Sequence, residues 1–533
     1  MTTLLLNGRI HSPTHPDATA MAIRGDVIAW LGSDDVARTQ FPDAAVVDLD
    51  GGFVAPAFVD SHVHVTSTGL LLTGLDLRAA TSKQHCLQLL AEHARRRPDA
   101  MIWGHGWDDS AWPQPGAPST AEVDAAVGAR PAYISRVDVH SALASTLLRA
   151  QTPGLAVADG YHPAEPLTAE AHHLVRAQAR TQLSAQQRAG ARTAALDAFA
   201  AAGIVAVHEC AGPQIGGLED WQELRAAGHG VEVLGYWGEA VDSAAHAQDL
   251  MATTGAHGLA GDLFVDGALG SHTAWLSQPY SDDTNCCGRS YLDTAAIAAH
   301  LRACTEVRIT AGFHVIGDAA VSAVVDALAQ VVNEFGVPAV ARCGHRLEHL
   351  EMVSADQAAQ LGAWGVIASV QPNFDALWGG ADGMYAQRLG PERARELNPF
   401  AALASAGVPL AFGSDSPVTG LDPWTTVRAA IAHQSPGSAV SARAAFSAAT
   451  RGGWRAGGTR DGVTGTLAVG AMASYSVWAA TELAVSAPAD SVQRWSTDPR
   501  SRVPALPSLE PGEDTPHCLQ TVHRGRTLFG RLS

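Results

Sequence analysis

Two histidines, His62 and His64, stand two positions apart just after an apolar run over 53–59. If this run belongs to a β-strand, both imidazoles point to the same side and can reach one point in space. Neutral imidazole is a preferred ligand of Zn²⁺, so the pair is suited to hold a metal ion. Such pairs also occur as ordinary surface or core histidines, and a metal site therefore needs further ligands elsewhere in the chain.

Buried runs that could position such ligands recur along the chain, and helix-like segments follow most of them. They span 204–208, 231–236, 263–266, 311–315, 346–349, 366–371 and 410–413. Together with the run over 53–64 they match the eight strands of a (β/α)8 TIM barrel, the α/β fold that we predict. The segment 67–190 is then an insertion after strand one, placed to act as a lid. The Ala/Arg/Gln-rich segment 168–202 is predicted to be one long helix.

Both ends of the chain have a different character, with short β-type runs separated by turns. These runs span 4–6, 21–23 and 27–31 near the start, and 463–467, 474–479 and 522–528 near the end. We expect 1–52 and 463–533 to build one small β-sandwich domain beside a barrel of residues 53–462. The Pro-rich stretch 487–516 is predicted to be a loop within it.

The predicted strand ends are rich in residues that can bind metal, and in TIM barrels the chemistry lies at the carboxyl ends of the strands. In chain order these ends carry His62 and His64, His208 and Glu209, Trp237, Asp266, His314, His349 and Asp415. Chance placement of 23 histidines would rarely give this pattern. The sequence therefore favours a metal site at the mouth of the barrel.

Composition narrows the class of protein. The net charge of -18 argues against nucleic-acid or anionic-membrane partners and leaves a small-molecule substrate as the expected ligand. Seven scattered cysteines without a CxxC spacing indicate neither a disulfide framework nor a Cys-rich zinc site. The amino terminus lacks the pattern of a signal peptide, and no run of about 18 apolar residues occurs, so we expect a cytoplasmic protein.

Several motifs together resemble the amidohydrolase superfamily, in particular the family-3 branch that includes N-substituted formamide deformylase. The matching segments span 56–64, 104–108, 266–271, 314–320, 346–349 and 413–417, and the segment 465–470 resembles the family's return into its β-sandwich. The order and spacing of these motifs are more specific than any one of them.

The resemblance implies a role for each ligand candidate. His62, His64 and Asp415 would hold a first metal, whereas His314 and His349 would hold a second metal, or serve one metal and the substrate. A zinc-type ion would activate water, and Asp415 would act as the base that passes a proton to the leaving amine. Family analogy also suggests a homodimer.

The activity implied is metal-dependent hydrolysis of a non-peptide C–N bond in a linear amide or N-substituted formamide. A mononuclear aminohydrolase that removes ammonia from a ring could use the same histidines and aspartate. A non-catalytic binding protein on the same barrel is a third reading, but it predicts a degraded ligand set, and this one is complete.

One position departs from the family pattern. Members of this branch often carry a lysine that becomes carbamylated and bridges two metals, and Asp262 stands where that lysine is expected. The sole lysine, Lys83, lies in the insertion. Asp262 could bridge two ions directly, Glu209 is another candidate for the bridge, and a single-metal site needs none, so one and two metals both stay open.

Four residues are candidates for substrate contacts, namely Trp107, Asp108, His140 and Glu209. The first three lie in the insertion, where a lid over the barrel mouth and an ordinary surface loop are equally compatible with the sequence. Glu209 is also compatible with a helix-start acid. Strand alternation predicts that Glu348 faces away from His349 and has a structural role.

Overall fold

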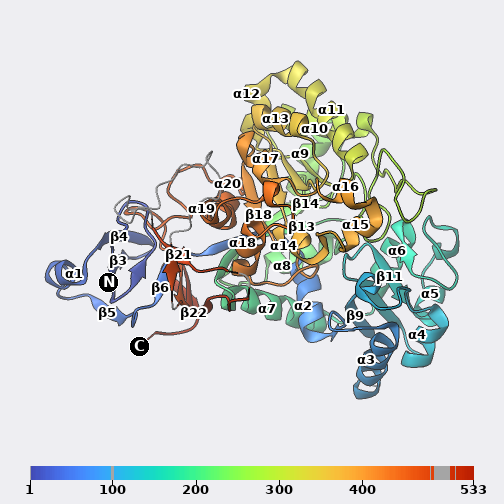
Figure 1. Cartoon of the computed structure of the whole chain (residues 1–533), viewed down its shortest axis with the longest axis horizontal. Coiled ribbons are helices and arrows are strands. Elements are labelled where there is room, and N and C mark those ends of the chain that lie inside the picture. Colours follow the sequence, from blue (N-terminus) through green and yellow to red (C-terminus); the bar gives the residue numbers. More distant parts are fainter. Residues whose placement is uncertain (1, 98–100, 481, 485–503, 511, 533) are drawn as a thin grey trace.

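The computed structural model describes residues 2–532 apart from 98–100, 481, 485–503 and 511 (Figure 1). Its centre is built from parallel strands of almost continuous apolar character, as expected where helices cover a sheet. One sheet contains β7 (Phe58–Val63), β13 (Ile204–Ala211) and β14 (Glu232–Trp237). The other runs in the order β15 (Gly312–Val315), β16 (Arg346–His349), β17 (Ile367–Val370) and β18 (Leu410–Phe412).

Isolated parallel bridges connect these two sheets. Val63 bridges to Ser416 just beyond β18, and on the other side the bridges are Tyr236–Gly258, Leu259–Ala311 and Phe264–His314. The predicted strand over 263–266 is therefore wrong as a regular strand, because a glycine-interrupted loop at 258–264 makes single contacts in its place. The arrangement is mixed α/β and consistent with a TIM-barrel hydrolase.

Helices follow the central strands and pack an apolar stripe against them. In α11 (Asp318–Phe335) the buried residues Val321, Val324, Val325 and Leu328 recur with helical spacing, which gives the helix one core-facing side. The other helices after residue 216 are α8 (Gly217–Arg225), α9 (Ala244–Thr254), α10 (Thr294–Glu306), α12 (Val337–Cys343), α13 (Ala355–Trp364), α14 (Pro372–Trp378), α15 (Met384–Leu389), α16 (Pro391–Ala394), α17 (Phe400–Ser405), α18 (Pro423–Ile431), α19 (Ala442–Ser447) and α20 (Gly453–Ala456).

The run over 53–64, predicted as one strand, is two strands that serve different sheets. β6 (Phe53–Pro56) pairs with β19 (Tyr475–Ala479) in an outer sheet, whereas β7 continues into the centre. Both strands are fully buried, so hydrophobicity alone could not reveal the division. Pro56 ends the outer strand, in keeping with its lack of a backbone donor.

Both chain ends meet in the outer sheets, at the left of Figure 1. One sheet has the order β4 (Val27–Gly32), β3 (Ala20–Arg24), β1 (Thr2–Leu6) and β5 (Ala45–Asp48), and α1 (Asp34–Gln40) precedes β5. The other has the order β2 (Arg9–Ile10), β6, β19, β22 (His517–His523) and β23 (Arg526–Phe529). The domain limits inferred from the sequence stay a prediction.

Two of the terminal runs differ from their predicted form. Residues 463–467 form turns, since Asp461 accepts hydrogen bonds from Val463 and Thr464 and curls the chain. The run 522–528 crosses the tight turn between β22 and β23. Most of the predicted loop 487–516 lies outside the described residues, although β21 (Leu506–Pro507) pairs with β20 (Leu483–Ala484).

The insertion after β7 forms a separate layer at the lower right of Figure 1. It starts with α2 (Val65–Thr73) and contains a sheet in the order β12 (Leu167–Thr168), β11 (Ser141–Ala144), β10 (Ala132–Arg136), β9 (Ile102–Trp107) and β8 (Leu75–Asp76). Its other helices are α3 (Lys83–Arg96), α4 (Thr120–Val127), α5 (Thr146–Ala150) and α6 (Ala169–Thr181).

The predicted long helix 168–202 is divided into α6 (Ala169–Thr181) and α7 (Ala185–Ala201). Ser184 and Gln187 form a reciprocal capping box at the start of α7, which satisfies backbone donors that a continuous helix would have paired. Among the described residues no single helix has the length and apolar character to cross a membrane; the bent pair α11 and α12 meets these criteria by length and composition alone.

Candidate metal centre

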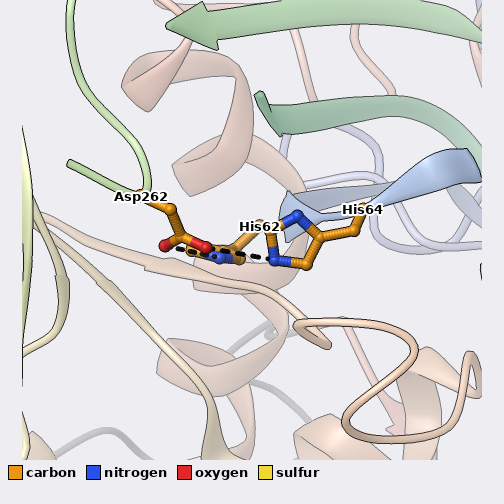
Figure 2. A group of neighbouring side chains, drawn as sticks. All are labelled: His62, His64 and Asp262. Carbon is orange, nitrogen blue, oxygen red and sulfur yellow. Dashed lines mark ion pairs between the residues drawn. The ribbon is translucent and has the colours of Figure 1, made fainter. Parts of the chain in front are cut away.

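His62 on β7 and His64 just after this strand both project toward the same carboxylate, that of Asp262 (Figure 2). His62 Nε2 lies 3.4 Å from Asp262 Oδ1, and His64 Nε2 lies 3.2 Å from Asp262 Oδ2. All three residues are buried. The spacing of two along a strand, which points alternate side chains to one face, accounts for the convergence of the two imidazoles.

Asp262 reaches this position from the loop after α9. Gly261 adopts a positive φ of 75°, and its neighbour Gly238 has no room for a Cβ because the Asp262 carbonyl would lie 2.6 Å away. These two glycines let the loop approach the sheet closely. Asp262 Oδ1 also lies 3.6 Å from His314 Nδ1 and 3.9 Å from His349 Nε2. Asp262 is therefore in reach of all four histidines.

Asp415 completes the group from the end of β18. Its backbone N–H donates to the His62 carbonyl, and its Oδ1 lies 3.4 Å from His62 Nε2 and 3.3 Å from His64 Nε2. Asp415 and His349 both have positive φ, 52° and 68°, a conformation that is uncommon for residues other than glycine and frequent at active sites. The structure thus brings together all six residues predicted as metal ligands.

Hydrogen bonds on the far side of three histidine rings set their tautomers. Glu348 Oε2 lies 2.9 Å from His62 Nδ1, Gln371 Oε1 lies 2.9 Å from His349 Nδ1, and the Gly267 carbonyl lies 3.1 Å from His314 Nε2. Each partner is an acceptor, so the ring nitrogen it faces carries the proton. His62 Nε2, His349 Nε2 and His314 Nδ1 are consequently the nitrogens available to bind a metal, and all three atoms face Asp262.

Glu348 is a correction to the sequence analysis. Strand alternation predicts that it faces away from His349, but the positive φ of His349 interrupts the alternation and both side chains reach the interior. Glu348 also receives Arg346 Nε and Nη2, at 2.5 and 2.9 Å. Arg346 in turn contacts His208 Nδ1 at 2.9 Å, so His208 packs against Arg346 rather than against Asp262. No feature of the sequence distinguished Glu348 from an ordinary strand residue.

The electrostatics of the group are those of a site built for positive charge. Burial lowers the pKa of His64, but hydrogen bonds and charge from Asp262 and Asp415 raise it to about 10. The pKa of His349 rises to about 9 against the effect of burial, through Asp262 and Asp415. Burial raises the pKa of Asp262, yet the surrounding histidines hold it well below the ordinary value. Both carboxylates therefore stay ionised.

The donor set fits divalent metal. His62 Nε2, His314 Nδ1, Asp262 Oδ1 and Asp415 Oδ1 are fully buried and lack a hydrogen-bond partner among the described residues. Buried polar atoms without partners are costly, and a cation would satisfy all four of them. Potential ligand atoms of His62, His64 and Asp262 lie within 4.8 Å of one another, and so do those of Asp262, His314 and His349.

A cavity opens beside the group. The metal-ligand candidates His64, Asp262, His314, His349 and Asp415 line it. Its opposite wall comes from the insertion and includes Trp103, Tyr133, His140, His173 and Arg176. The sequence analysis did not find His173 or Arg176, because nothing in a helix-forming segment distinguishes a residue that faces a cavity.

The four predicted substrate contacts are distributed differently. His140 lines the cavity with its ring 5.1 Å from that of His314. Glu209 accepts the Val65 backbone N–H at 2.7 Å, which caps the start of α2, and burial raises its pKa to about 7. Trp107 donates to the Ile134 carbonyl, and Asp108 pairs with Arg136 at 2.6 Å. Glu209, Trp107 and Asp108 are absent from the described lining of the cavity.

A parallel-stranded α/β fold in which four histidines and two aspartates converge on one buried centre is typical of a metal-dependent hydrolase. The model of the amidohydrolase family matches residues 45–529, and the chain belongs to this family. The putative amidohydrolase YtcJ of Bacillus subtilis is 28% identical over 440 residues, which cover 78% of this chain and 80% of that protein. N-substituted formamide deformylase of Arthrobacter pascens is 22% identical over 77% of this chain and 80% of its own.

A solved structure gives the same picture of the fold. The crystal structure of an uncharacterized metal-dependent hydrolase from Pyrococcus furiosus is 25% identical and has a TM-score of 0.68, covering 90% of this chain and 98% of its own. The likeness therefore extends over the central strands, the outer sheets and the insertion rather than over a single motif.

Proposed function

We propose that this hydrolase cleaves the C–N bond of linear amides, including N-substituted formamides, with Zn²⁺ as its metal. The observation that carries the proposal is the set of three imidazole nitrogens, on His62, His314 and His349, directed at the Asp262 carboxylate. A site dominated by neutral imidazole with carboxylate oxygens suits zinc. We also infer that the central sheets and their bridges form one closed (β/α)8 barrel around this site.

We infer further that Asp262 takes the place of a bridging ligand between two ions. Two potential ligand sets, His62–His64–Asp262 and Asp262–His314–His349, have Asp262 alone in common. Its Oδ2 faces His64, whereas its Oδ1 is within reach of the other three histidines. Asp415 would complete the ligands on the His62 and His64 side.

Zinc, when bound, lowers the pKa of a water molecule and polarises a substrate carbonyl. The chain's own groups then handle the protons. Asp415 lies at the cavity wall and is ionised, so its carboxylate can accept a proton from the attacking water and return it to the leaving nitrogen. Water adds across the bond, with its oxygen on the acyl carbon and hydrogen on nitrogen, and the products are an amine and a carboxylic acid.

The first test is metal content per chain, measured by elemental analysis on protein purified without added metal or chelator. We expect two equivalents in the wild type and fewer than two in Asp262→Ala, which removes the shared ligand. Asp318→Ala is a matched control, because Asp318 contacts Ser277 outside the centre and the variant should keep both ions.

Activity is measured in parallel on simple formamides and acylated amines. Amine release by the wild type that is lost in Asp262→Ala would support the proposal. One equivalent of metal that Asp262→Ala leaves unchanged would contradict the bridge. Metal-loaded protein that releases amine from none of a broad set of linear amides would contradict the reaction itself.

A further inference from the structure

The cavity wall opposite the metal centre contains one buried arginine without a carboxylate partner. Four arginines are buried among the described residues: Arg136, Arg176, Arg192 and Arg346. Three of them pair closely with acids. Arg136 lies 2.8 Å from Asp138, Arg192 lies 2.9 Å from Asp220, and Arg346 lies 2.5 Å from Glu348.

Arg176 differs from these three. Its side chain is nine-tenths buried, with a residue exposure of 7%, and within the described part of the chain it makes no ion pair. Its Nη2 donates to the Gln214 carbonyl at 2.7 Å, while its Nε has no hydrogen-bond partner there. An arginine that is buried and unpaired is unfavourable, and most proteins avoid it unless an anion binds.

The position of Arg176 connects it to the reaction centre. It lies on α6 one turn after His173, and both residues line the cavity. The ring of His173 lies 5.6 Å from that of Phe264, which lies 4.9 Å from the ring of His314. Burial lowers the pKa values of His173 and His140 well below the ordinary value, so these neighbours are neutral.

Charge in the cavity is therefore divided between two sites. Asp262 and Asp415 are the acids among its described lining residues, and both belong to the cation-binding group. Arg176 is the permanently charged base of the same lining. Outside the cation-binding group, Arg176 is the one permanent charge of the described lining, and its positive charge is suited to a carboxylate.

A second lobe continues on the other side of the centre. It shares His140, His314, His349 and Asp415 with the main cavity, and most of its wall is apolar, from Leu269, Ile316, Phe374, Trp378, Met384 and Val418. Besides Asp415, its acids are Asp138, which is paired with Arg136 and Ser271, and Glu351, whose pKa burial raises to about 7 and whose Oε2 lacks a hydrogen-bond partner among the described residues. The lobe suits an aromatic or alkyl group and disfavours an anion.

From this arrangement we propose that the substrate is an amide with a carboxylate at one end, bound by Arg176, and an apolar group at the other, bound in the second lobe. N-acylated amino acids with aromatic acyl groups have this chemistry. The inference rests on the proposed amide hydrolysis and specifies its substrate class. Arg176 would bind substrate without taking part in bond cleavage.

The test compares two substrates that differ in one charge, N-phenylacetylglycine and N-phenylacetylglycinamide. Because a charge-assisted hydrogen bond to a buried group contributes about 10- to 100-fold in affinity, we expect the wild type to prefer the carboxylate by that factor in kcat/KM. Arg176→Met should remove the preference for the carboxylate. Arg176→Lys should restore part of it.

Arg180→Gln is the matched control, because Arg180 lies one turn further on α6, contacts Ser67 and Asp220, and is not among the described lining residues. It should keep the wild-type preference. Equal turnover of the two substrates by the wild type would overturn the inference even if Arg176→Met failed to fold. A preference that persists in a folded Arg176→Met protein would overturn it as well.

A binding measurement separates this inference from the proposed reaction. 5-Phenylpentanoate has the same shape without a scissile bond, and its amide is the neutral match. Calorimetric titration of the metal-loaded protein should show tighter binding of the acid, lost in Arg176→Met. If binding depends on Arg176 but no amide is hydrolysed, the reaction is wrong and the anion site stands. If the carboxylate binds wild type and variant equally, the anion site is wrong.

Discussion

Two buried charged clusters lie on opposite sides of the His62 ring. They differ in whether their polar atoms have hydrogen-bond partners. The lower cluster, on the Nδ1 side, consists of Glu348 and Arg346, and Glu348 accepts hydrogen bonds from His62 and from Arg346. Arg346 also donates to the Ser61 carbonyl at 2.6 Å and to Ser369 Oγ at 2.9 Å. The upper cluster, on the Nε2 side, consists of Asp262, Asp415 and the three histidines His64, His314 and His349. Here Asp262 Oδ1 and Asp415 Oδ1 are buried and lack a hydrogen-bond partner among the described residues.

The difference lies in the source of positive charge. In the lower cluster Arg346 supplies it, and against the effect of burial it holds the Glu348 pKa well below the ordinary value. His62, Cys210 and Glu348 also lie within metal-ligand distances, but their acid is already paired, and burial raises the pKa of the Cys210 thiol well above its ordinary value. The upper cluster has no arginine or lysine to pair with its acids among the described residues, and we therefore infer that metal binds on this side of His62.

Removing the metal should therefore abolish function while leaving the lower cluster intact. We expect treatment with a strong chelator to eliminate amide hydrolysis and to lower the unfolding temperature, because a ligand bound by the folded state alone stabilises it. Far-UV circular dichroism should stay unchanged, and added Zn²⁺ should restore activity. Full hydrolytic activity in protein shown by elemental analysis to be metal-free would contradict the comparison.

Within the upper cluster, Asp415→Asn should have the next largest effect. The amide keeps the shape of the side chain but cannot accept a proton from water, so kcat should fall by about 10²- to 10⁴-fold. Glu209→Gln is a matched control, because Glu209 is an equally buried acid that caps α2 outside the described cavity lining, and it should stay within a few-fold of wild type. Similar losses in both variants would remove the case for Asp415 as the base.

The lower cluster is probed by Glu348→Gln, which leaves the Arg346 charge buried and unpaired. Loss of one partner of a buried ion pair costs about 3–5 kcal/mol of stability, measured by denaturant unfolding. Because Glu348 also orients His62, metal affinity should fall about 10- to 100-fold, measured by competition with a chelator.

The double variant Arg346→Met/Glu348→Leu separates these two effects. It removes both charges and should recover much of the lost stability, whereas metal affinity should stay low because His62 Nδ1 still lacks an acceptor. Recovery of both properties would show that Glu348 acts on the metal site through stability alone.

Most of the upper cluster could be predicted from the sequence, whereas the lower cluster could not. His62, His64, His314, His349 and Asp415 lie at or just after strand ends, and regular strands make such positions meet at one edge. Asp262 was noticed because it stands where the family has a lysine. Glu348 was assigned to the opposite face, since alternation holds until a residue such as His349 adopts positive φ, and this cannot be read from a sequence.

Other differences have equally local causes. The sequence contains a signal for the division between α6 and α7, because Ser184 followed by Gln187 has the spacing of a capping box. The strong helix formers on both sides of it nevertheless predict one continuous helix. The division between β6 and β7 has no such signal, because both strands are buried. Arg176 has no signal in the sequence at all, since the lack of a partner is a property of the folded chain.

The smallest effect that we expect concerns Gln371, which holds His349 as Glu348 holds His62 but without a charge. Gln371→Leu removes the acceptor of the His349 Nδ1 proton, and the ring can then rotate or change tautomer. The variant should lower kcat/KM by about 10-fold through weaker metal binding, with little change in unfolding free energy. Gln371→Glu restores an acceptor and adds a negative charge, so it should bind metal at least as tightly as the wild type. If Gln371→Leu instead destabilised the protein as much as Glu348→Gln, the contrast between a charged and an uncharged support would be wrong.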